Sequence, residues 1–188
     1  MFEKRKIQIE EENVKLGMYF FNICIIILST RGVRMYIDYY KSLIGLVKIV
    51  ADDQGVCRTK YVDDKDEEEN PNQWTEETKN QLKEYFSGQR TEFDLPLIIK
   101  GTPFQLKVWE ALQTIPYGST CTYKDIANKI DNIKSVRSVG NANNKNKFVI
   151  IIPCHRIIGC NNKMVGYVGG IFRKQILLDH EKSILENL

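Results

Sequence analysis

A cysteine and a histidine stand next to each other in the stretch VIIIPCHRIIG, which runs from Val149 to Gly159. A cysteine thiolate is a strong nucleophile, and a histidine within reach can act as the base that generates it. The flanking isoleucines favour burial, which by itself raises the pKa of a thiol and makes it inert. The stretch leaves three interpretations of Cys154 open: a nucleophile, a metal ligand or a small core side chain.

The cysteine and histidine content argues against a metal site. The five cysteines form no C-x-x-C pair, and the two histidines, His155 and His180, do not lie at zinc-ligand spacing from a cysteine pair. We therefore predict no metal and no disulfide framework. A reducing compartment follows, so we expect an intracellular protein, in the nucleus of a eukaryote or the cytoplasm of a prokaryote.

A nucleophilic Cys154 must be coupled to its neighbour, and adjacent residues on a strand point to opposite faces. Either a turn after Pro153 or a bridging water would be required to couple Cys154 and His155. Downstream, GYVGG at 166–170 predicts a glycine-rich loop that lets the backbone approach a ligand closely, with Tyr167 offering an aromatic face.

The elements around this stretch are helical. TPFQLKVWEALQTI at 102–115 predicts a helix with Pro103 in its first turn and an apolar stripe. TYKDIANKI at 122–130 and SVRSVGNANN at 135–144 predict two short helices joined by a tight turn. This pair is a helix-turn-helix candidate, a pattern that occurs in DNA-binding proteins and in many other helical domains.

The first half instead has the pattern of strands between Gly17 and Thr59. The apolar run from Tyr19 to Ile27 is too short for a membrane span of roughly 20 residues, so we expect a buried strand and no membrane association. DDQG at 52–55 predicts a hairpin turn, 63–73 an exposed acidic loop, and 75–88 a helix capped by Thr75. The stretch 89–100 is expected to be an extended linker.

Charge is distributed unevenly over the 188 residues, whose net charge is +3. Residues 1–100 carry 15 Lys and Arg against 18 Asp and Glu, whereas residues 101–188 carry 12 against 6. The basic half is the half with the cysteine–histidine pair. A positive surface of this kind attracts phosphate backbones, although a small excess is also typical of a solvated face.

With these elements in order, the chain closely resembles the O6-alkylguanine-DNA alkyltransferases, also called methylated-DNA–protein-cysteine methyltransferases. The resemblance rests on GTPFQLKVWEALQTIPYGSTCTY, IANKI, VRSVGNANNKN, IIIPCHRIIG and GYVGGIFRKQILLDHE, with LKEYFSGQRTEFDLPL matching the segment before them, and it covers about residues 75–182. It implies an α+β fold with two domains. Residues 1–97 would form an N-terminal α/β domain with a small, mainly antiparallel sheet, and residues 98–188 a mostly helical, winged-helix-like domain with the helix-turn-helix.

The resemblance also implies the chemistry. Cys154 would accept the alkyl group of O6-alkylguanine, and more weakly of O4-alkylthymine, in one irreversible turnover without a cofactor. His155 would generate the thiolate through a water, Glu181 would orient the imidazole, and Asn146 would support the turn of Cys154. Tyr123 would neutralise the charge that develops on the leaving guanine.

In this family the helix-turn-helix enters the minor groove of double-stranded DNA and the protein acts as a monomer. Arg137 would fill the stack left by a flipped-out base. Small residues would let the helix approach the groove closely; they are Ser138, Gly140 and Ala142. The base itself would be held by the backbone near Ile157 and by Tyr167 and Val168.

Two departures from the family pattern stand out. Lys147 follows Asn146 where members often have proline, and no histidine precedes His155, so the zinc site of some N-terminal domains is not expected. Three other functions remain open from the residues: an alkyltransferase-like protein that binds lesions without transfer, a thiol hydrolase, and a helix-turn-helix regulator.

Overall fold

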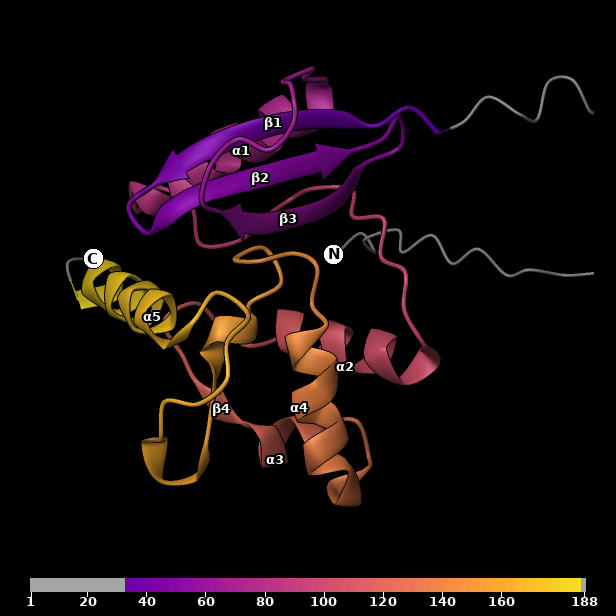
Figure 1. Ribbon diagram of the computed structural model, residues 1–188. Coiled ribbons are helices and arrows are strands. Elements are labelled where there is room, and N and C mark those ends of the chain that lie inside the picture. The colour runs from indigo at the N-terminus through magenta and orange to yellow at the C-terminus, as the bar shows by residue number, and fades with distance from the viewer. Residues whose placement is uncertain (1–32, 187–188) are drawn as a thin grey trace, which may run out of the picture.

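The computed structural model describes residues 33–186 and has two parts (Figure 1). The first is a three-stranded antiparallel sheet in the order β1-β2-β3, with strands Tyr36–Ser42, Gly45–Ala51 and Val56–Val62. Helix α1, Gln73–Phe86, packs against one face of this sheet. The predicted strand at Tyr19–Ile27 lies outside the described residues.

The predicted hairpin turn at DDQG is confirmed between β2 and β3. The Asp52 carboxylate accepts hydrogen bonds from the backbone N–H groups of Gln54 and Gly55, at 2.8 and 3.0 Å. Such an Asx turn satisfies the backbone inside the loop, which explains why Asp is favoured at its first position.

The predicted cap of α1 was wrong. The cap is Asn72, whose side-chain oxygen accepts from the N–H groups of Trp74 and Thr75 at 3.1 and 3.0 Å. Thr75 lies one turn inside, where its hydroxyl accepts from the backbone N–H of Asn72 at 2.9 Å. The two side chains form a reciprocal capping box, so the helix begins earlier than the threonine alone indicated.

The acidic loop is exposed, as predicted, and two of its carboxylates form ion pairs with a buried lysine. Lys48 on β2 is 1% exposed and its ammonium contacts Asp66 at 2.6 Å as well as Glu67. The phenol of Tyr39 donates to the same Asp66 carboxylate at 2.9 Å. The loop thus pairs a cation that the sheet would otherwise leave buried without a counter-charge.

The second part is mostly helical and begins with α2, Pro103–Gln113. Helix α3, Tyr123–Lys129, and helix α4, Val136–Asn144, are joined through the short 3-10 helix η2, Ile133–Ser135. Two further 3-10 turns follow, η3 at Cys154–Arg156 and η4 at Cys160–Asn162. Strand β4, Cys121–Thr122, pairs in parallel with β5, Ile157–Ile158, and α5, Ile171–Glu186, ends the described chain. The expected α+β architecture is confirmed.

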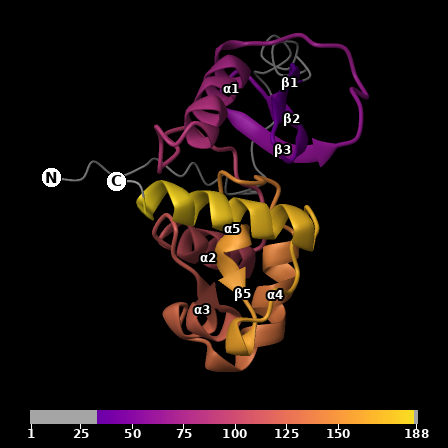
Figure 2. The same ribbon diagram turned by 90° about the vertical axis from the view of Figure 1, so that its left-hand side faces the viewer.

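The two parts meet along α5 and along the free edge of β3. Figure 2 shows α5 between the sheet part and the remaining helices, and the Arg173 guanidinium of α5 donates to the carbonyl of Ile44 at 2.7 Å. The outer edge of β3 forms parallel bridges from Val56 to Leu97 and from Thr59 to Phe148. The loop before Cys154 is therefore fastened to the sheet.

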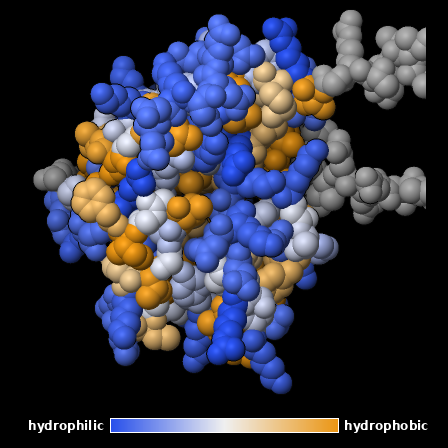
Figure 3. All heavy atoms as spheres, in the orientation of Figure 1, coloured by the Kyte–Doolittle hydropathy of each residue, from blue (hydrophilic) through white to orange (hydrophobic). Residues whose placement is uncertain are grey.

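The surface seen in Figure 3 is largely hydrophilic, with apolar side chains scattered in small groups. Within residues 33–186, no helix has the length and apolar content to cross a membrane.

Candidate active site

Asn146 holds the loop that leads to Cys154. Its side-chain N–H group reaches the Cys154 sulfur at 3.0 Å and the carbonyl of Ile152 at 2.9 Å, while its oxygen accepts from the N–H of Phe148 at 2.9 Å. Within this loop Ile150 has a φ of 72° and is 1% exposed. A β-branched residue rarely adopts that left-handed conformation, so the packed surroundings must impose it.

Cys154 and His155 lie on the 3-10 turn η3 rather than on a strand, which is the turn after Pro153 that their coupling requires. Both side chains are fully buried. His155 Nε2 lies 2.8 Å from Glu181 Oε1, whereas Nδ1 is buried and has no hydrogen-bond partner among the described residues. Because a carboxylate only accepts, Nε2 carries the proton and Nδ1 keeps its lone pair.

Glu181 gathers four groups around one buried carboxylate. The Arg156 guanidinium donates to it through Nε at 2.9 Å and Nη2 at 3.0 Å, and the N–H of Gly118 donates at 2.9 Å. The phenol of Tyr85, from α1 in the sheet part, donates to Oε1 at 2.8 Å. Burial raises the pKa of Glu181, but hydrogen bonds and charge from His155 and Arg156 outweigh it and hold this pKa well below its usual range.

The pKa values of the cysteine and the histidine favour a base-assisted thiol. Burial raises the pKa of Cys154 to about 11, although the Asn146 hydrogen bond and the charge of Lys174 oppose the shift. Burial also lowers the pKa of His155; the Glu181 carboxylate works against this and the charges of Arg156 and Lys174 add to it. At neutral pH the thiol is protonated and the imidazole is neutral, so the imidazole can accept a proton.

Lys174 on α5 is the buried cation whose charge acts on the cysteine. Its ammonium is fully buried and donates to the carbonyls of Ile157, Val165 at 2.6 Å and Gly166 at 3.3 Å. Burial lowers the pKa of Lys174 to about 8, and the charge of Cys154 opposes that shift. The lysine ties the strand after Cys154 to the glycine-rich loop and stabilises a thiolate electrostatically.

Tyr123 is the first residue of α3, after the cap Thr122. A side chain at Gly166, which has a φ of 47°, would lie 3.0 Å from the Tyr123 hydroxyl, and one at Gly140 would lie 3.7 Å from its ring. Glycine at 166 therefore allows the loop to approach the phenol closely. Burial and the charge of Cys154 raise the pKa of Tyr123, so the phenol keeps its proton beside a thiolate.

The three predicted pocket residues lie in different surroundings. Tyr167 is buried, and its ring makes a T-shaped contact with the His155 imidazole at 6.2 Å between centroids. Its hydroxyl lies 3.3 Å from that of Tyr61 on β3. Ile157 is buried and uses its carbonyl to bind Lys174. Val168 points outward and is 51% exposed.

The residues predicted to face DNA on α4 divide into two groups. Arg137 and Ser138 are exposed and Gly140 is partly exposed. Ala142 is 2% exposed, and its carbonyl accepts from the Trp109 indole at 2.9 Å. Ala142 therefore packs against α2 and does not share the exposed face with Arg137, contrary to the expectation.

Two family models match the chain. Residues 35–99 match the ribonuclease-like domain of 6-O-methylguanine DNA methyltransferase, and residues 103–183 match its DNA-binding domain. A methylated-DNA–protein-cysteine methyltransferase of Methanosarcina acetivorans is 43% identical over 155 residues, which cover 79% of this chain and 99% of that protein. The chain belongs to the methylated-DNA–protein-cysteine methyltransferase family. As a member, it is a DNA-repair enzyme that transfers an alkyl group to a cysteine.

Solved structures of the family agree with this fold. The crystal structure of Mycobacterium tuberculosis O6-methylguanine methyltransferase superimposes with a TM-score of 0.72 at 38% identity, covering 80% of this chain and 94% of that one. The same enzyme has been solved in complex with DNA, and that structure superimposes with a TM-score of 0.71. The methyltransferase therefore carries the DNA-binding domain of its family in a matching arrangement.

Three residues at the centre of the methyltransferase site were missed by the sequence interpretation. The hydrogen bonds that Tyr85 and Arg156 donate to Glu181 were not predicted, and neither were those that Lys174 donates to the carbonyls around it. The available signal was helical spacing, since Lys174 lies three and four residues before Leu177 and Leu178 and therefore on the same face of the helix.

Proposed function

We propose that Cys154 is the alkyl acceptor of this methyltransferase and that His155, acting through a water, removes its proton. The observation that carries the proposal is a pair of buried hydrogen bonds on neighbouring residues. Asn146 binds the sulfur, and Glu181 binds Nε2 of the histidine next in sequence, which leaves Nδ1 without a partner among the described residues. A nucleophile, a base and an orienting carboxylate are the parts of an activated cysteine.

The transfer is a displacement at the alkyl carbon. The Cys154 sulfur forms a bond to that carbon while the bond from carbon to O6 of guanine breaks, and guanine leaves with the electron pair. His155 has taken the thiol proton, and Tyr123 supplies a proton to the leaving guanine. The products are a thioether and an unmodified guanine, so each molecule acts once.

DNA would reach the acceptor through α4. The buried thiol can contact only a base that has been flipped out of the DNA duplex, and flipping a base costs about a few kcal/mol. Arg137, exposed on the first turn of α4, would fill the vacated stack, with Ser138 and Gly140 against the minor groove. The base would lie between the backbone near Ile157 and the glycine-rich loop.

The test is transfer of a label from duplex DNA that contains one labelled O6-methylguanine. We expect one equivalent of label on the protein, and none on Cys154→Ala. The exposed Cys160 gives a matched control, because Cys160→Ala should transfer at the wild-type rate. Label on Cys154→Ala would overturn the assignment.

The same assay separates the other functions. Tight binding of the lesion with no transfer would support an alkyltransferase-like protein, and repeated turnover of an acyl ester would support a hydrolase. A second duplex with O4-methylthymine should transfer its label more slowly.

A further inference from the structure

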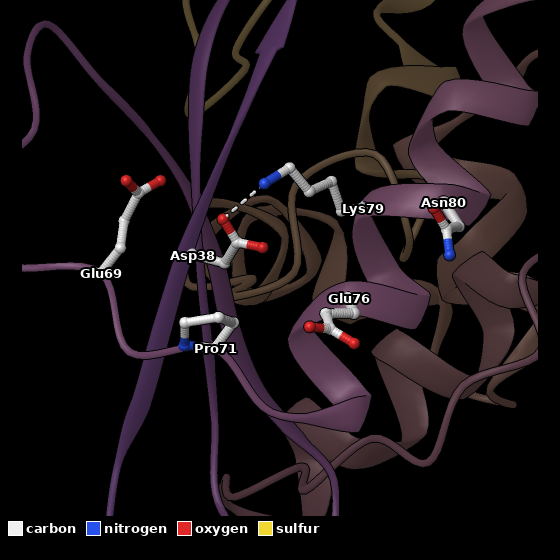
Figure 4. A pocket seen from close by; sticks show the side chains of 6 residues that line it. All are labelled: Asp38, Glu69, Pro71, Glu76, Lys79 and Asn80. Carbon is white, nitrogen blue, oxygen red and sulfur yellow. Dashed lines mark hydrogen bonds and ion pairs between the residues drawn. The ribbon is translucent and has the colours of Figure 1, made fainter.

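Two pockets on the surface of the described residues differ in charge. One, of about 440 Å³, lies between β1 and α1 and carries both signs of charge (Figure 4). There the Lys79 ammonium contacts the Asp38 carboxylate at 2.7 Å. That pairing gives a structural role to Lys79 and Asp38, and the acidic residues Glu69 and Glu76 that also line the pocket make it unsuited to an anion.

The second pocket, of about 460 Å³, is basic. Four of the nine described residues that line it are cationic, and none of the nine is acidic. The cations are Arg58, Lys100, Lys145 and Lys147, all exposed, and the remaining lining residues are Thr102, Gln105, Trp109, Asn144 and Asn146. We call this pocket the basic groove.

Pairing along the edge of β3 explains why cations from three segments meet. Near its start, β3 bridges to Leu97, which directs the following segment toward Lys100. Near its middle, the N–H of Thr59 donates to the carbonyl of Lys147 at 2.9 Å. Arg58 precedes Thr59, so the edge of the sheet brings it beside the loop that leads to Cys154.

We propose that the basic groove binds the phosphodiester backbone of DNA beside the lesion, which makes β3 part of the DNA-binding surface. The proposal rests on the proposed function and extends it. Closely spaced cations with neutral amides and no acid suit phosphate oxygens. The DNA-binding domain model spans residues 103–183, so Arg58 and Lys100 lie outside it.

The groove also adjoins the acceptor. Asn146 lines it and donates to the Cys154 sulfur at 3.0 Å. Lys145 and Lys147 precede and follow Asn146 in the chain, so a phosphate bound by both lysines would restrain Asn146 from either side. Binding of the DNA backbone would therefore stabilise this turn, in which Lys147 replaces the proline common in the family.

The test compares two variants with the same change in charge. In the groove variant, Arg58, Lys145 and Lys147 are changed to Gln; in the control variant, three exposed lysines outside the groove are changed to Gln. The control positions are Lys41, Lys83 and Lys182. Affinity for an undamaged duplex is measured by fluorescence anisotropy at several salt concentrations.

We expect the groove variant to flatten the plot of log affinity against log salt by about 0.9 for each DNA phosphate that it no longer neutralises. Its affinity at 0.1 M salt should fall about tenfold for each of these phosphates, and the control should keep the wild-type slope. On a duplex with one O6-methylguanine, with Cys154→Ala present to block transfer, replacing single phosphates beside the lesion with neutral methylphosphonates should weaken binding at one or two positions. The same replacements should have no effect there when the groove variant also carries Cys154→Ala.

Equal slopes for the groove and control variants would overturn the proposal. The proposal would also be overturned if inorganic phosphate shifted the NMR signals of Lys145 and Lys147 in the wild type while the groove variant kept the wild-type affinity for the duplex. The salt-dependence comparison uses undamaged DNA and does not depend on alkyl transfer. A failure of the transfer assay would therefore contradict the proposed function without affecting the result for the basic groove.

Discussion

In the described part of the chain each half buries one lysine completely, Lys48 on β2 and Lys174 on α5. Lys48 contacts two carboxylates. Burial lowers its pKa, but the hydrogen bonds that the ammonium donates to Asp66 and Glu67 outweigh burial, so the pKa is raised. Among the described residues, the Lys174 ammonium donates only to backbone carbonyls, and burial lowers its pKa to about 8.

The difference lies in what each positive charge remains able to do. The charge of Lys48 is neutralised within its own half and stabilises the fold of the acidic loop. The carbonyls around Lys174 orient the ammonium without cancelling its charge, so the charge still acts on Cys154. The sheet half uses buried charge for structure, and the helical half uses it for reactivity.

The strongest test of this division removes one carboxylate from each half. Glu181→Gln should slow single-turnover transfer by about 10²-fold or more, because a neutral amide no longer stabilises the imidazolium and can donate to Nε2 as well as accept from it, so the tautomer of His155 is no longer fixed. It should also lower the free energy of unfolding by about 3–5 kcal/mol, since Arg156 stays buried without its counter-charge. Asp66→Asn should leave transfer unchanged. A similar loss of transfer in both variants would end the distinction between the halves.

The two lysines give a closer comparison. Lys174→Met should slow transfer about tenfold near neutral pH, because a loss of one pKa unit in thiolate stabilisation is a factor of ten. Lys48→Met should transfer normally and show only a small fall in its urea midpoint, because Asp66 and Glu67 return to water. Transfer rates across pH 6–9 and urea unfolding curves are measured for both variants. An unchanged transfer rate in Lys174→Met would contradict the electrostatic role of Lys174.

One contact crosses the division, because Tyr85 belongs to the sheet half yet donates to Glu181. Tyr85→Phe should lower the free energy of unfolding by about 1.5–3 kcal/mol, as expected for a hydrogen bond to a charged group, and slow transfer a few-fold. Tyr117 provides the control: its buried hydroxyl has no partner among residues 33–186, so Tyr117→Phe should change neither quantity. If Tyr85→Phe and Tyr117→Phe changed stability and transfer equally, the hydrogen bond from Tyr85 to Glu181 would have no role of its own.

The smallest expected effect is the pH dependence of stability. Burial lowers the pKa of His155, whereas the unfolded chain takes up this proton near pH 6.5. The unfolded state therefore binds more protons below pH 6.5, and stability falls as the pH drops, by up to about 1 kcal/mol between pH 6.5 and 5.5. In urea unfolding, the free energy of unfolding should differ less between the two pH values for His155→Gln than for the wild type. An equal difference in the two proteins would mean that another group causes the pH dependence.

Much of the architecture could be predicted from sequence because its signals are local. The turn at 52–55 and the helices of the second half follow from the residues within them. The start of α1 was misjudged because Asn72 and Thr75 are both good caps, and only the reciprocal hydrogen bonds decide between them. The boundary predicted between residues 97 and 98 stays a prediction.

The site was predicted less completely because its partners are distant in sequence. Tyr85 reaches a carboxylate 96 residues away, and Lys174 binds carbonyls, which every residue carries and no pattern reveals. Ala142 was assigned to the DNA face by its size, yet a small residue also suits a close contact with Trp109. Residue type alone does not separate these two uses.

The left-handed backbone at Ile150 ties the competence of the acceptor to the whole fold. A glycine would adopt this conformation in an isolated peptide, whereas isoleucine does so only when the surrounding core is assembled. A partly folded chain with its helices intact would therefore present Cys154 in the wrong geometry. Alkyl transfer is then a reporter of native packing, and we expect it to disappear under mild denaturant before helical content does.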